Sequence, residues 1–560
     1  MTYERNYNLL NNKFKELFIP TLLASIAGNF AVLADALLIS MFMGPLNLFV
    51  IQSVGPLVAF VNVIYWLIGF GGSILCTHAR AEFDSEKGNY LFTVSLISVI
   101  LIGLAISLLG FLFPDFFMQL LSASNQFKPI ISQYFNLYII GIPFLSYFAV
   151  LAYFIKTDDF IKLQFRTFLL CNAINVILDV VFIKFLNFGI AGAGLATTLG
   201  NIIAAIYITT YFFNSKATLK LVKVRFFKSM RYLVDISKAG FSSASIPLYE
   251  SVKLLFINIL IGGILGEVGL AAFNMCFNTL YFVGIFILGT AQSILPIVAV
   301  YYAEEDFQGI DYVTKISLKI ALLFGIFFTI LFVVFPQSIL SIFSVTDPLQ
   351  IPIILNAVRI FSLCFLGYSI SLLYIFYAPS VEYYKLANII AILEGLILPI
   401  IFAYLFGYFW SVDGIWISFS ITEVGTVLFI YIYSKYVSKK TNGMYSGFFI
   451  NKQLRDKRRK EYTVKGNKED VLILSKEINS YFDDSNLSLV IEQMLFYIID
   501  INDGLDWIDI IVREKDDSFL ISIKDNGINF NPENINSSAD DIDYSQILGF
   551  NITLLTVKNN

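Results

Sequence analysis

Twelve long apolar runs occupy most of this 560-residue sequence and restrict what it can fold into. A helix that crosses a bilayer needs about 20 mostly apolar residues, and each run is about that long. With 57% hydrophobic and 14% charged residues, the composition excludes an ordinary soluble protein. The runs cover residues 17–39, 50–76, 91–113, 131–154, 167–186, 191–213, 240–263, 269–299, 316–335, 353–377, 387–406 and 413–434. They predict an all-α polytopic membrane protein with twelve transmembrane helices.

Basic residues alternate between the loops in a way that predicts orientation. Lys156, Lys162 and Arg166 follow the fourth run, and the loop 214–238 after the sixth run is also rich in Lys and Arg. The loops after odd-numbered runs are nearly free of basic residues. Short loops with excess Lys and Arg stay in the cytoplasm. We therefore expect a multi-pass protein of the cell membrane with both termini in the cytoplasm.

The membrane portion repeats itself. The stretch GFGGSIL at residues 69–75 matches GTAQSIL at 289–295, and GAGL at 192–195 matches GIWI at 414–417. Both matches have nearly the same offset, so we expect two six-helix bundles. The predicted divisions are an N-terminal lobe at 1–214, a basic linker at 215–238, a C-terminal lobe at 239–436, a basic juxtamembrane linker at 437–461 and a soluble domain at 462–560.

Acidic residues inside apolar runs are the candidate functional residues. Asp35, Asp179, Glu250 and Glu394 lie well inside such runs, and Glu423 is a shallower fifth. A carboxylate at the bilayer centre costs roughly 2.5–3.5 kcal/mol on the mildest scale, and such residues usually mark ion or proton pathways. The alternative for each is a structural carboxylate satisfied by a neighbouring polar side chain.

Asn175 and Asp179 form the most informative pair. They lie four residues apart, so they share one face of a helix. Their oxygens can bind a hard cation, and the carboxylate can instead hold a proton. The pair predicts either an ion site or a buried polar patch.

The sequence resembles the multidrug and toxic compound extrusion (MATE) transporters over roughly residues 10–435. The resemblance rests on Asp35 with the following Gly44-Pro45, on the stretches at 69–73 and 289–296, and above all on NVILDVVFIKFLNFGIAGAGLATTLG at 175–200. The family couples outward drug export to the inward movement of Na⁺ or H⁺. The resemblance therefore implies a secondary active antiporter that exports amphipathic organic cations by alternating access, and not an enzyme.

The resemblance also implies particular site residues. The cation or proton site in the N-terminal lobe would comprise Asp35, Asn175, Asp179 and Thr197, with Thr198 as the alternative to Thr197. Glu250 and Glu394 are possible acids of a site in the second lobe. The coupling ion would be Na⁺ or H⁺, and no other cofactor is required. The partners implied are small organic cations and membrane lipid.

The chain changes character after residue 436. A basic run at residues 455–460 is typical of a segment that lies on the inner leaflet, and we expect no nucleic-acid partner. Beyond it, the sequence predicts helices at 468–482 and 486–501, strands at 506–514 and 518–524, a loop and a short closing helix. The tail is thus expected to be a small cytoplasmic α/β domain.

The tail has an acidic residue, Glu492, in a predicted helix, Asp525 and Gly527 after a predicted strand, and a second glycine turn at Gly549. At these positions it resembles the ATP-binding fold of histidine kinases and anti-sigma-factor kinases. The departures are Phe496 in place of the Mg²⁺-binding Asn, and Asn529 and Asn551 in place of glycines. Since Mg²⁺ neutralises charge in phosphoryl transfer, this loss argues against a kinase. The resemblance implies a degenerate domain that senses a nucleotide or binds a cytoplasmic regulatory protein, and ATP binding stays open.

Two other functions compete with drug export. One is a flippase of lipid-linked oligosaccharide or another lipid, which would place several basic residues in a central cavity; Lys253 and Arg359 are the candidates. The other is a membrane-anchored signalling protein that acts through its tail. Twelve helices with buried acids are more than an anchor needs, which favours transport.

Overall fold

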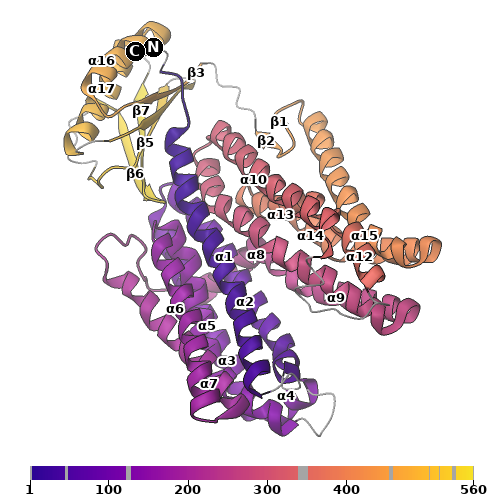
Figure 1. Ribbon diagram of the computed structural model, residues 1–560. Helices are drawn as coiled ribbons and strands as arrows, with labels where there is room; N and C mark the ends of the chain where they lie inside the picture. Colours follow the sequence, from indigo (N-terminus) through magenta and orange to yellow (C-terminus); the bar gives the residue numbers. More distant parts are fainter. Residues whose placement is uncertain are drawn as a thin grey trace.

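The computed structural model describes residues 3–558 apart from short internal segments at 44–47, 122–127, 338–350, 453–457, 503–504, 516–517 and 532–537. It also leaves out some side chains inside helices, chiefly between residues 27 and 53 and between 251 and 274. Figure 1 shows two helical bundles side by side and a small α/β unit at one end, where both chain termini lie.

The first bundle, here the N-terminal lobe, is continuous helix with short turns. Its elements are α1 (Asn8–Met43), α2 (Leu48–Ala81), α3 (Ser85–Leu112), α4 (Pro114–Leu121), α5 (Lys128–Thr157), α6 (Ile161–Asp179), the π-helix η2 (Val180–Phe185), α7 (Gly189–Ile208) and the 3₁₀-helix η3 (Thr209–Phe213). Local sequence sets several boundaries. Asp84 caps α3 by accepting from the Lys87 amide at 2.9 Å, and the turn before α7 uses positive φ angles at Asn187 and Gly189.

The second bundle, here the C-terminal lobe, follows a connecting helix α8 (Phe226–Ala244). Its elements are α9 (Ile246–Ala303), α10 (Phe307–Val334), α12 (Ile351–Phe361), α13 (Cys364–Ser380), α14 (Tyr384–Ile392), the π-helix η4 (Leu393–Ile397) and α15 (Leu398–Lys440). The predicted linker at 215–238 is thus partly helical, since it contains most of α8. Within α15, Trp410 and Ser411 have non-helical backbone angles, at the predicted boundary between the last two apolar runs.

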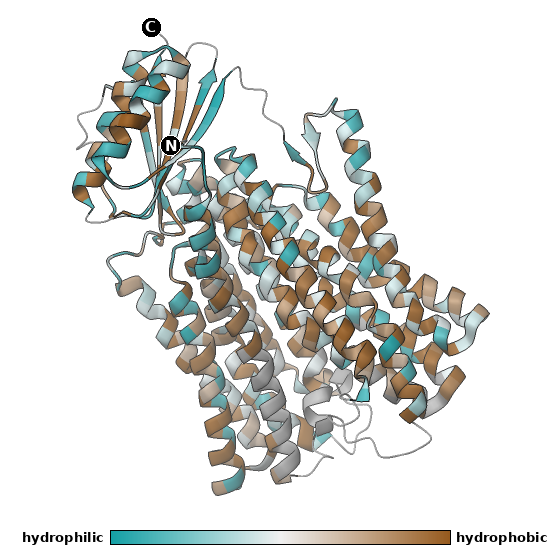
Figure 2. Ribbon diagram, turned by 45° about the horizontal axis from the view of Figure 1, so that its top comes forward, coloured by the Kyte–Doolittle hydropathy of each residue, from teal (hydrophilic) through white to brown (hydrophobic). Residues whose placement is uncertain are grey.

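Among the described residues, nine helices are long and apolar enough to cross a membrane, or ten when the bent pair α12–α13 is counted as one span. Helix α9 carries two of them, Ile246–Leu265 and Met275–Ala303. The prediction of a helical polytopic fold is confirmed, whereas the total of twelve spans stays a prediction. Figure 2 shows hydrophobic residues along both bundles and hydrophilic residues concentrated towards the α/β unit.

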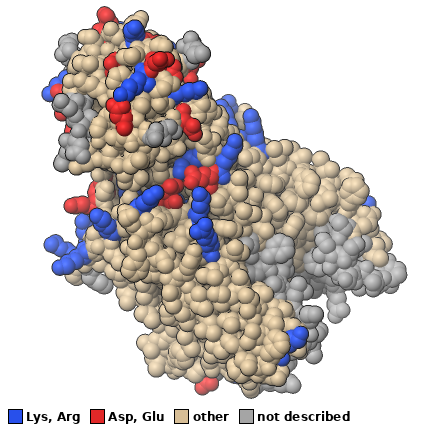
Figure 3. Space-filling view, turned by 60° about the vertical axis from the view of Figure 1, so that its left-hand side comes forward, with Lys and Arg blue, Asp and Glu red and all other residues tan. Residues whose placement is uncertain are grey.

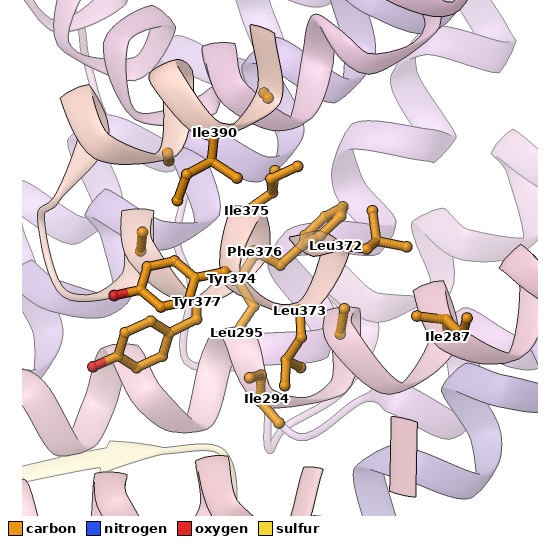
Figure 4. Packing of buried hydrophobic residues seen from close by; sticks show 14 of the residues in the cluster. Ile287, Ile294, Leu295, Leu372, Leu373, Tyr374, Ile375, Phe376, Tyr377 and Ile390 are labelled. Atoms are coloured by element: carbon orange, nitrogen blue, oxygen red, sulfur yellow. The ribbon is translucent and has the colours of Figure 1, made fainter. Parts of the chain in front are cut away.

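The core of the C-terminal lobe is built around α13. Ile287, Ile294 and Leu295 of α9 lie beside the run from Leu372 to Tyr377, and Ile390 of α14 lies beyond it (Figure 4). All these side chains are buried. Helix α13 therefore packs against both α9 and α14. Glu250 lies in α9, Glu394 in η4 directly after α14, and Glu423 in α15.

The C-terminal α/β unit, here the tail unit, comprises β3 (Arg459–Val464), α16 (Lys468–Phe482), α17 (Ser485–Ile501), β4 (Ile508–Lys515), β5 (Ser518–Asp525), β6 (Asp541–Ile547) and β7 (Phe550–Lys558). A hairpin of β1 (Tyr445–Ser446) and β2 (Asn451–Lys452) precedes it. The five-stranded sheet is antiparallel with the order β3-β4-β5-β7-β6. Apolar residues of α16 and α17 form one core with the sheet.

The two predicted helices and the two predicted strands of the tail are confirmed, but the prediction of a short closing helix is wrong. Residues 550–558 form β7 and pair with β5 and β6. Leu548 and Gly549 both have positive φ and form the two-residue turn that joins β6 to β7. Side chains alternate across β7 towards its end, which suits a half-buried strand better than a helix.

Candidate functional site

The N-terminal lobe brings two of the predicted site residues into direct contact. Asn175 lies in α6 and Thr197 in α7, and these helices pack together. The Asn175 side-chain amide donates a hydrogen bond to the Thr197 hydroxyl at 3.2 Å. That hydroxyl donates in turn to the Ala193 carbonyl at 3.0 Å. The helices come close at Gly200, because a Cβ there would lie 3.0 Å from the Cys171 carbonyl oxygen.

Asp179 lies one turn beyond Asn175 and is fully buried, with 0% of its surface exposed. It is the last residue of α6, and the π-helix η2 begins directly after it. Short π-helical segments inside α-helices occur frequently at functional sites because they shift the register of the backbone. The structure thus places Asn175, Asp179 and Thr197 in one region between α6 and α7.

The other two candidates for the N-terminal site are Asp35 in α1 and Thr198 in α7. Helix α1, which carries Asp35, packs against both α6 and η2, but the Asp35 side chain lies outside the described residues. Thr198 donates to the Leu137 carbonyl in α5 at 2.7 Å. Thr197, and not its neighbour Thr198, therefore contacts Asn175. In the described part of the chain, no three His, Cys, Asp or Glu side chains form a metal cluster.

The C-terminal lobe contains a larger polar group. Glu423 of α15 is buried and accepts a hydrogen bond from the Ser371 hydroxyl at 2.7 Å. Glu250 of α9 accepts from the Tyr281 hydroxyl at 3.0 Å. Glu394, in the π-helix η4, is buried and interacts with Glu423. The structure therefore gathers Glu394 and the shallower candidate Glu423 into one group.

Lys253 supplies positive charge to this group. It is 4% exposed, and its ammonium interacts electrostatically with Glu250, Glu394 and Glu423. Sequence reasoning treated Lys253 only as a candidate for a lipid-binding cavity. Its spacing of three residues from Glu250 was the available signal that the two share a helix face.

Among the tail positions expected from the resemblance to ATP-binding folds, Asp525 has surroundings that differ from those of Glu492 and Gly549. Asp525 ends β5, and one of its oxygens accepts from the Gly527 amide at 2.7 Å and from the Asn551 side chain at 2.8 Å. In the described part of the chain, its second oxygen is buried without a hydrogen-bond partner. Burial raises the pKa of Asp525 to about 6, although these two hydrogen bonds oppose the shift. A purine amino group would suit this free acceptor.

The other tail positions do not fit a magnesium nucleotide. Gly549 lies in the β6–β7 turn, and a Cβ there would lie 2.5 Å from a carboxylate oxygen of Asp159. This acidic neighbour would repel a phosphate. Glu492 is half-buried in α17, and Phe496 one turn later supplies no metal ligand. A cavity of about 810 Å³ lies between Gly527 and the loops of the N-terminal lobe.

Comparison with known proteins agrees with the two-lobe arrangement. A chain with two helical lobes, each holding acids within long apolar helices, has the organisation of a polytopic membrane transporter. The model of the MatE family matches residues 20–181 and 247–405, which is more than half of the chain and includes one segment in each lobe. The chain belongs to the MatE family of multi-pass membrane transporters and is not an enzyme. The match ends before the tail unit begins.

Curated relatives and solved structures give the same picture. The multidrug export protein MepA of Staphylococcus haemolyticus is 25% identical over 363 residues, covering 64% of this chain and 79% of that protein. MepA of Staphylococcus saprophyticus is 23% identical and covers 70% and 90%. An outward-facing multidrug resistance MATE family transporter of the MOP superfamily superposes with a TM-score of 0.71 at 19% identity, covering 77% of this chain and 96% of that one.

A MOP superfamily transporter from Pyrococcus furiosus gives a TM-score of 0.70 at 20% identity, covering 76% and 96%. At these identities the structural matches show the fold.

Proposed function

We propose that this protein is a secondary active antiporter that exports amphipathic organic cations in exchange for Na⁺ or H⁺ by alternating access. One observation carries the proposal: the fully buried Asp179 lies one helical turn from the Asn175–Thr197 hydrogen bond, inside the lobe that the family model matches. The names of the MepA relatives, which are multidrug export proteins, support the choice of cargo.

The chemistry of the N-terminal group suits a coupling ion. A buried carboxylate in a low-dielectric region favours a bound proton or cation over a bare charge. The amide oxygen of Asn175 and the hydroxyl oxygen of Thr197 are hard ligands that suit Na⁺. Binding would neutralise the lobe and change how α1, α6 and α7 pack. A transporter requires such a difference in ion affinity between its two conformations.

The test is ion-driven export from membrane vesicles. We would load a fluorescent organic cation and impose Na⁺ and pH gradients separately, which also identifies the ion. Asp35→Asn and Asp179→Asn should abolish coupled export while both variants remain folded in the membrane. Asp115→Asn is the matched control, because Asp115 is exposed in α4. Undiminished ion-driven export in both test variants would refute the assignment.

We also propose that the acids of the C-terminal lobe take part in proton movement. Glu394 and Glu423 lie close enough to interact, and two neighbouring buried carboxyl groups favour a proton on one of them. Glu250 lies in the same electrostatic group. Export by Glu394→Gln under a pH gradient tests this role, and unchanged pH dependence would contradict it.

The flippase alternative has less support. Arg359 is exposed on α12, whereas Lys253 is buried beside three glutamates that offset its charge. The two residues therefore differ in environment and do not supply a shared basic cavity. Transport of a labelled lipid-linked oligosaccharide in the same vesicles distinguishes the two functions.

For the tail unit, we propose a cytoplasmic regulatory role without phosphoryl transfer. The basic loops that follow the fourth and sixth apolar runs support placing this unit and both termini in the cytoplasm. The orphaned acceptor of Asp525 favours a purine, but Asp159 and Phe496 oppose a bound magnesium phosphate. Calorimetric titration of the full-length protein with ATP and with adenosine tests this. Tight Mg-dependent ATP binding would contradict the proposal.

A further inference from the structure

The tail unit contacts both lobes at once, on the side where the lobes contact each other. Between the lobes, His78 of α2 lies 2.9 Å from the Ser380 carbonyl oxygen, and the Lys156 ammonium donates to the Gln292 carbonyl at 2.9 Å. These contacts join the two lobes on the tail side. Charged side chains gather on the tail unit and where it meets the helices, while the helical surface below it shows few charged side chains in this view (Figure 3).

Arg5 joins three parts of the molecule. It is buried and forms ion pairs with Asp306, at the start of α10, at 2.7 Å, and with Glu461 and Asp509 of the tail sheet at 3.1 and 3.2 Å. Burial alone would raise the pKa of Asp306, but the charge of Arg5 and its hydrogen bonds hold that pKa well below the usual value. The ion pairs therefore stabilise the contact between the tail unit and the C-terminal lobe.

The N-terminal segment also extends the tail sheet. The Arg5 amide donates to the Glu461 carbonyl at 3.3 Å, and the Thr463 amide donates to the Tyr3 carbonyl at 2.9 Å. These bonds lie along the free edge of β3. The chain then enters α1 at Asn8, within a few residues of this edge. The tail unit is thus bound to the start of the helix that carries Asp35.

Two further ion pairs bind the tail unit to the loop between α9 and α10. The Lys524 ammonium lies 2.5 Å from the Glu304 carboxylate and 3.5 Å from the centre of the Tyr301 ring. Arg513 pairs with Glu305 at 2.9 Å. Lys524 and Glu304 are both almost fully buried. Removing one partner of a buried pair would leave an uncompensated charge, so these contacts favour the docked position.

The β6–β7 hairpin makes the contacts with the N-terminal lobe. The Leu548 amide donates to the Thr157 carbonyl at 3.0 Å, and the Ser545 hydroxyl donates to the Arg80 carbonyl at 3.0 Å. Leu548 is fully buried and belongs to the same apolar cluster as Leu10 of α1. The hairpin turn fits closely, since a Cβ on Gly549 would meet Asp159.

We infer that the tail unit is an intramolecular clamp that holds the tail-side ends of the two lobes together and stabilises the conformation closed on that side. Alternating access requires these ends to separate in the opposite conformation. Contacts with both lobes that exist only in the closed state shift the equilibrium towards it. The inference rests on the proposed transport function only for its assumption of alternating access.

The test measures the distance between the lobes in the full-length protein. Spin labels would be placed at Glu86→Cys and Lys385→Cys, two exposed positions at the tail-side ends of α3 and α14. Arg513→Glu should increase, by about fivefold or more, the fraction of molecules in which the two labels are far apart. Adding Glu305→Arg should reverse most of this increase by restoring the ion pair. Arg458→Glu is the matched control, because Arg458 pairs with Glu514 inside the tail unit.

A second variant examines the other lobe. Gly549→Asp places a carboxylate against Asp159, and an aspartate tolerates the positive φ at this position better than most residues. It should shift the distances in the same direction, and it answers the same question if Arg513→Glu does not fold. Unchanged distances in either folded variant would overturn the clamp. The measurement requires no transport, so its failure is distinct from a failure of the proposed antiport.

Discussion

The two lobes place acids at corresponding positions but surround them differently. Asp179 directly precedes the π-helix η2, and Glu394 lies inside the π-helix η4. In the N-terminal lobe Asn175 of α6 and Thr197 of α7, both neutral side chains, share a hydrogen bond one helical turn from Asp179. In the C-terminal lobe the neighbours include the ammonium of Lys253.

This difference suggests a division of labour. The group of Asn175, Asp179 and Thr197 offers carboxylate, amide and hydroxyl oxygens, which suit an incoming ion. In the C-terminal lobe the ammonium of Lys253 offsets part of the negative charge of Glu250, Glu394 and Glu423. Breaking a compensated group should damage stability, whereas changing the ion-binding group should damage coupling.

The largest expected difference is in export. Asp179→Asn should reduce ion-driven export about tenfold or more, since each 1.4 kcal/mol of lost ion binding is tenfold in affinity. Glu394→Gln should stay within about fivefold, because Glu423 remains beside Lys253. The measurement is the initial rate in vesicles, normalised to the amount of folded protein. Equal losses of export rate in Asp179→Asn and Glu394→Gln would contradict the proposed functional difference between the lobes.

Stability should show the opposite order. Lys253→Met leaves Glu394 and Glu423 buried without their counter-charge and should destabilise the protein by about 3–5 kcal/mol. Lys184→Met, at an exposed residue of η2 in the N-terminal lobe, should stay within about 0.5 kcal/mol. Unfolding of the purified proteins, followed by size-exclusion chromatography after heating, checks both. A stable Lys253→Met variant would show that the acids there are already neutral.

A carboxylate in an apolar run stands out in the sequence without any knowledge of packing, and the structure buries Asp179, Glu394 and Glu423. The sequence could not predict η2 and η4, since a π-helical turn depends on backbone pairing and not on composition. The grouping of Glu394 with Glu423 depends on how η4 meets α15 across the lobe. That contact joins segments far apart in the chain, which sequence patterns do not record.

Packing around the two sites offers a further comparison. A Cβ on Gly367 would clash with the Glu423 Cβ, so Gly367→Ala should cost about 1–3 kcal/mol. Gly200→Ala should cost less, because its nearest contact, the Cys171 carbonyl oxygen, is at 3.0 Å. Gly263→Ala is the control, with no atom within 4 Å of its added Cβ in the described structure. Thermal unfolding of the three variants gives the order of their stability losses. A larger loss of stability in Gly200→Ala than in Gly367→Ala would contradict this prediction.

The tail shows where local patterns fail. Its helices follow from apolar spacing, but the chain closes with the strand β7 where the sequence predicts a short helix, and the sequence does not predict β3. Both strands depend on partners elsewhere in the sheet, and the edge of β3 is completed by residues near the N-terminus. Pairing across more than 450 residues leaves no local signal.

The smallest expected effect separates two adjacent threonines. Thr197→Val removes the acceptor of the Asn175 hydrogen bond, which is worth about 1 kcal/mol, and should weaken ion coupling several-fold. Thr198→Val removes a bond to the Leu137 carbonyl, so it should lower stability by a similar amount without altering the ion dependence. The ion concentration for half-maximal export distinguishes them. If Thr198→Val shifts that concentration and Thr197→Val does not, the ion site lies next to α5, and its proposed position between α6 and α7 is wrong.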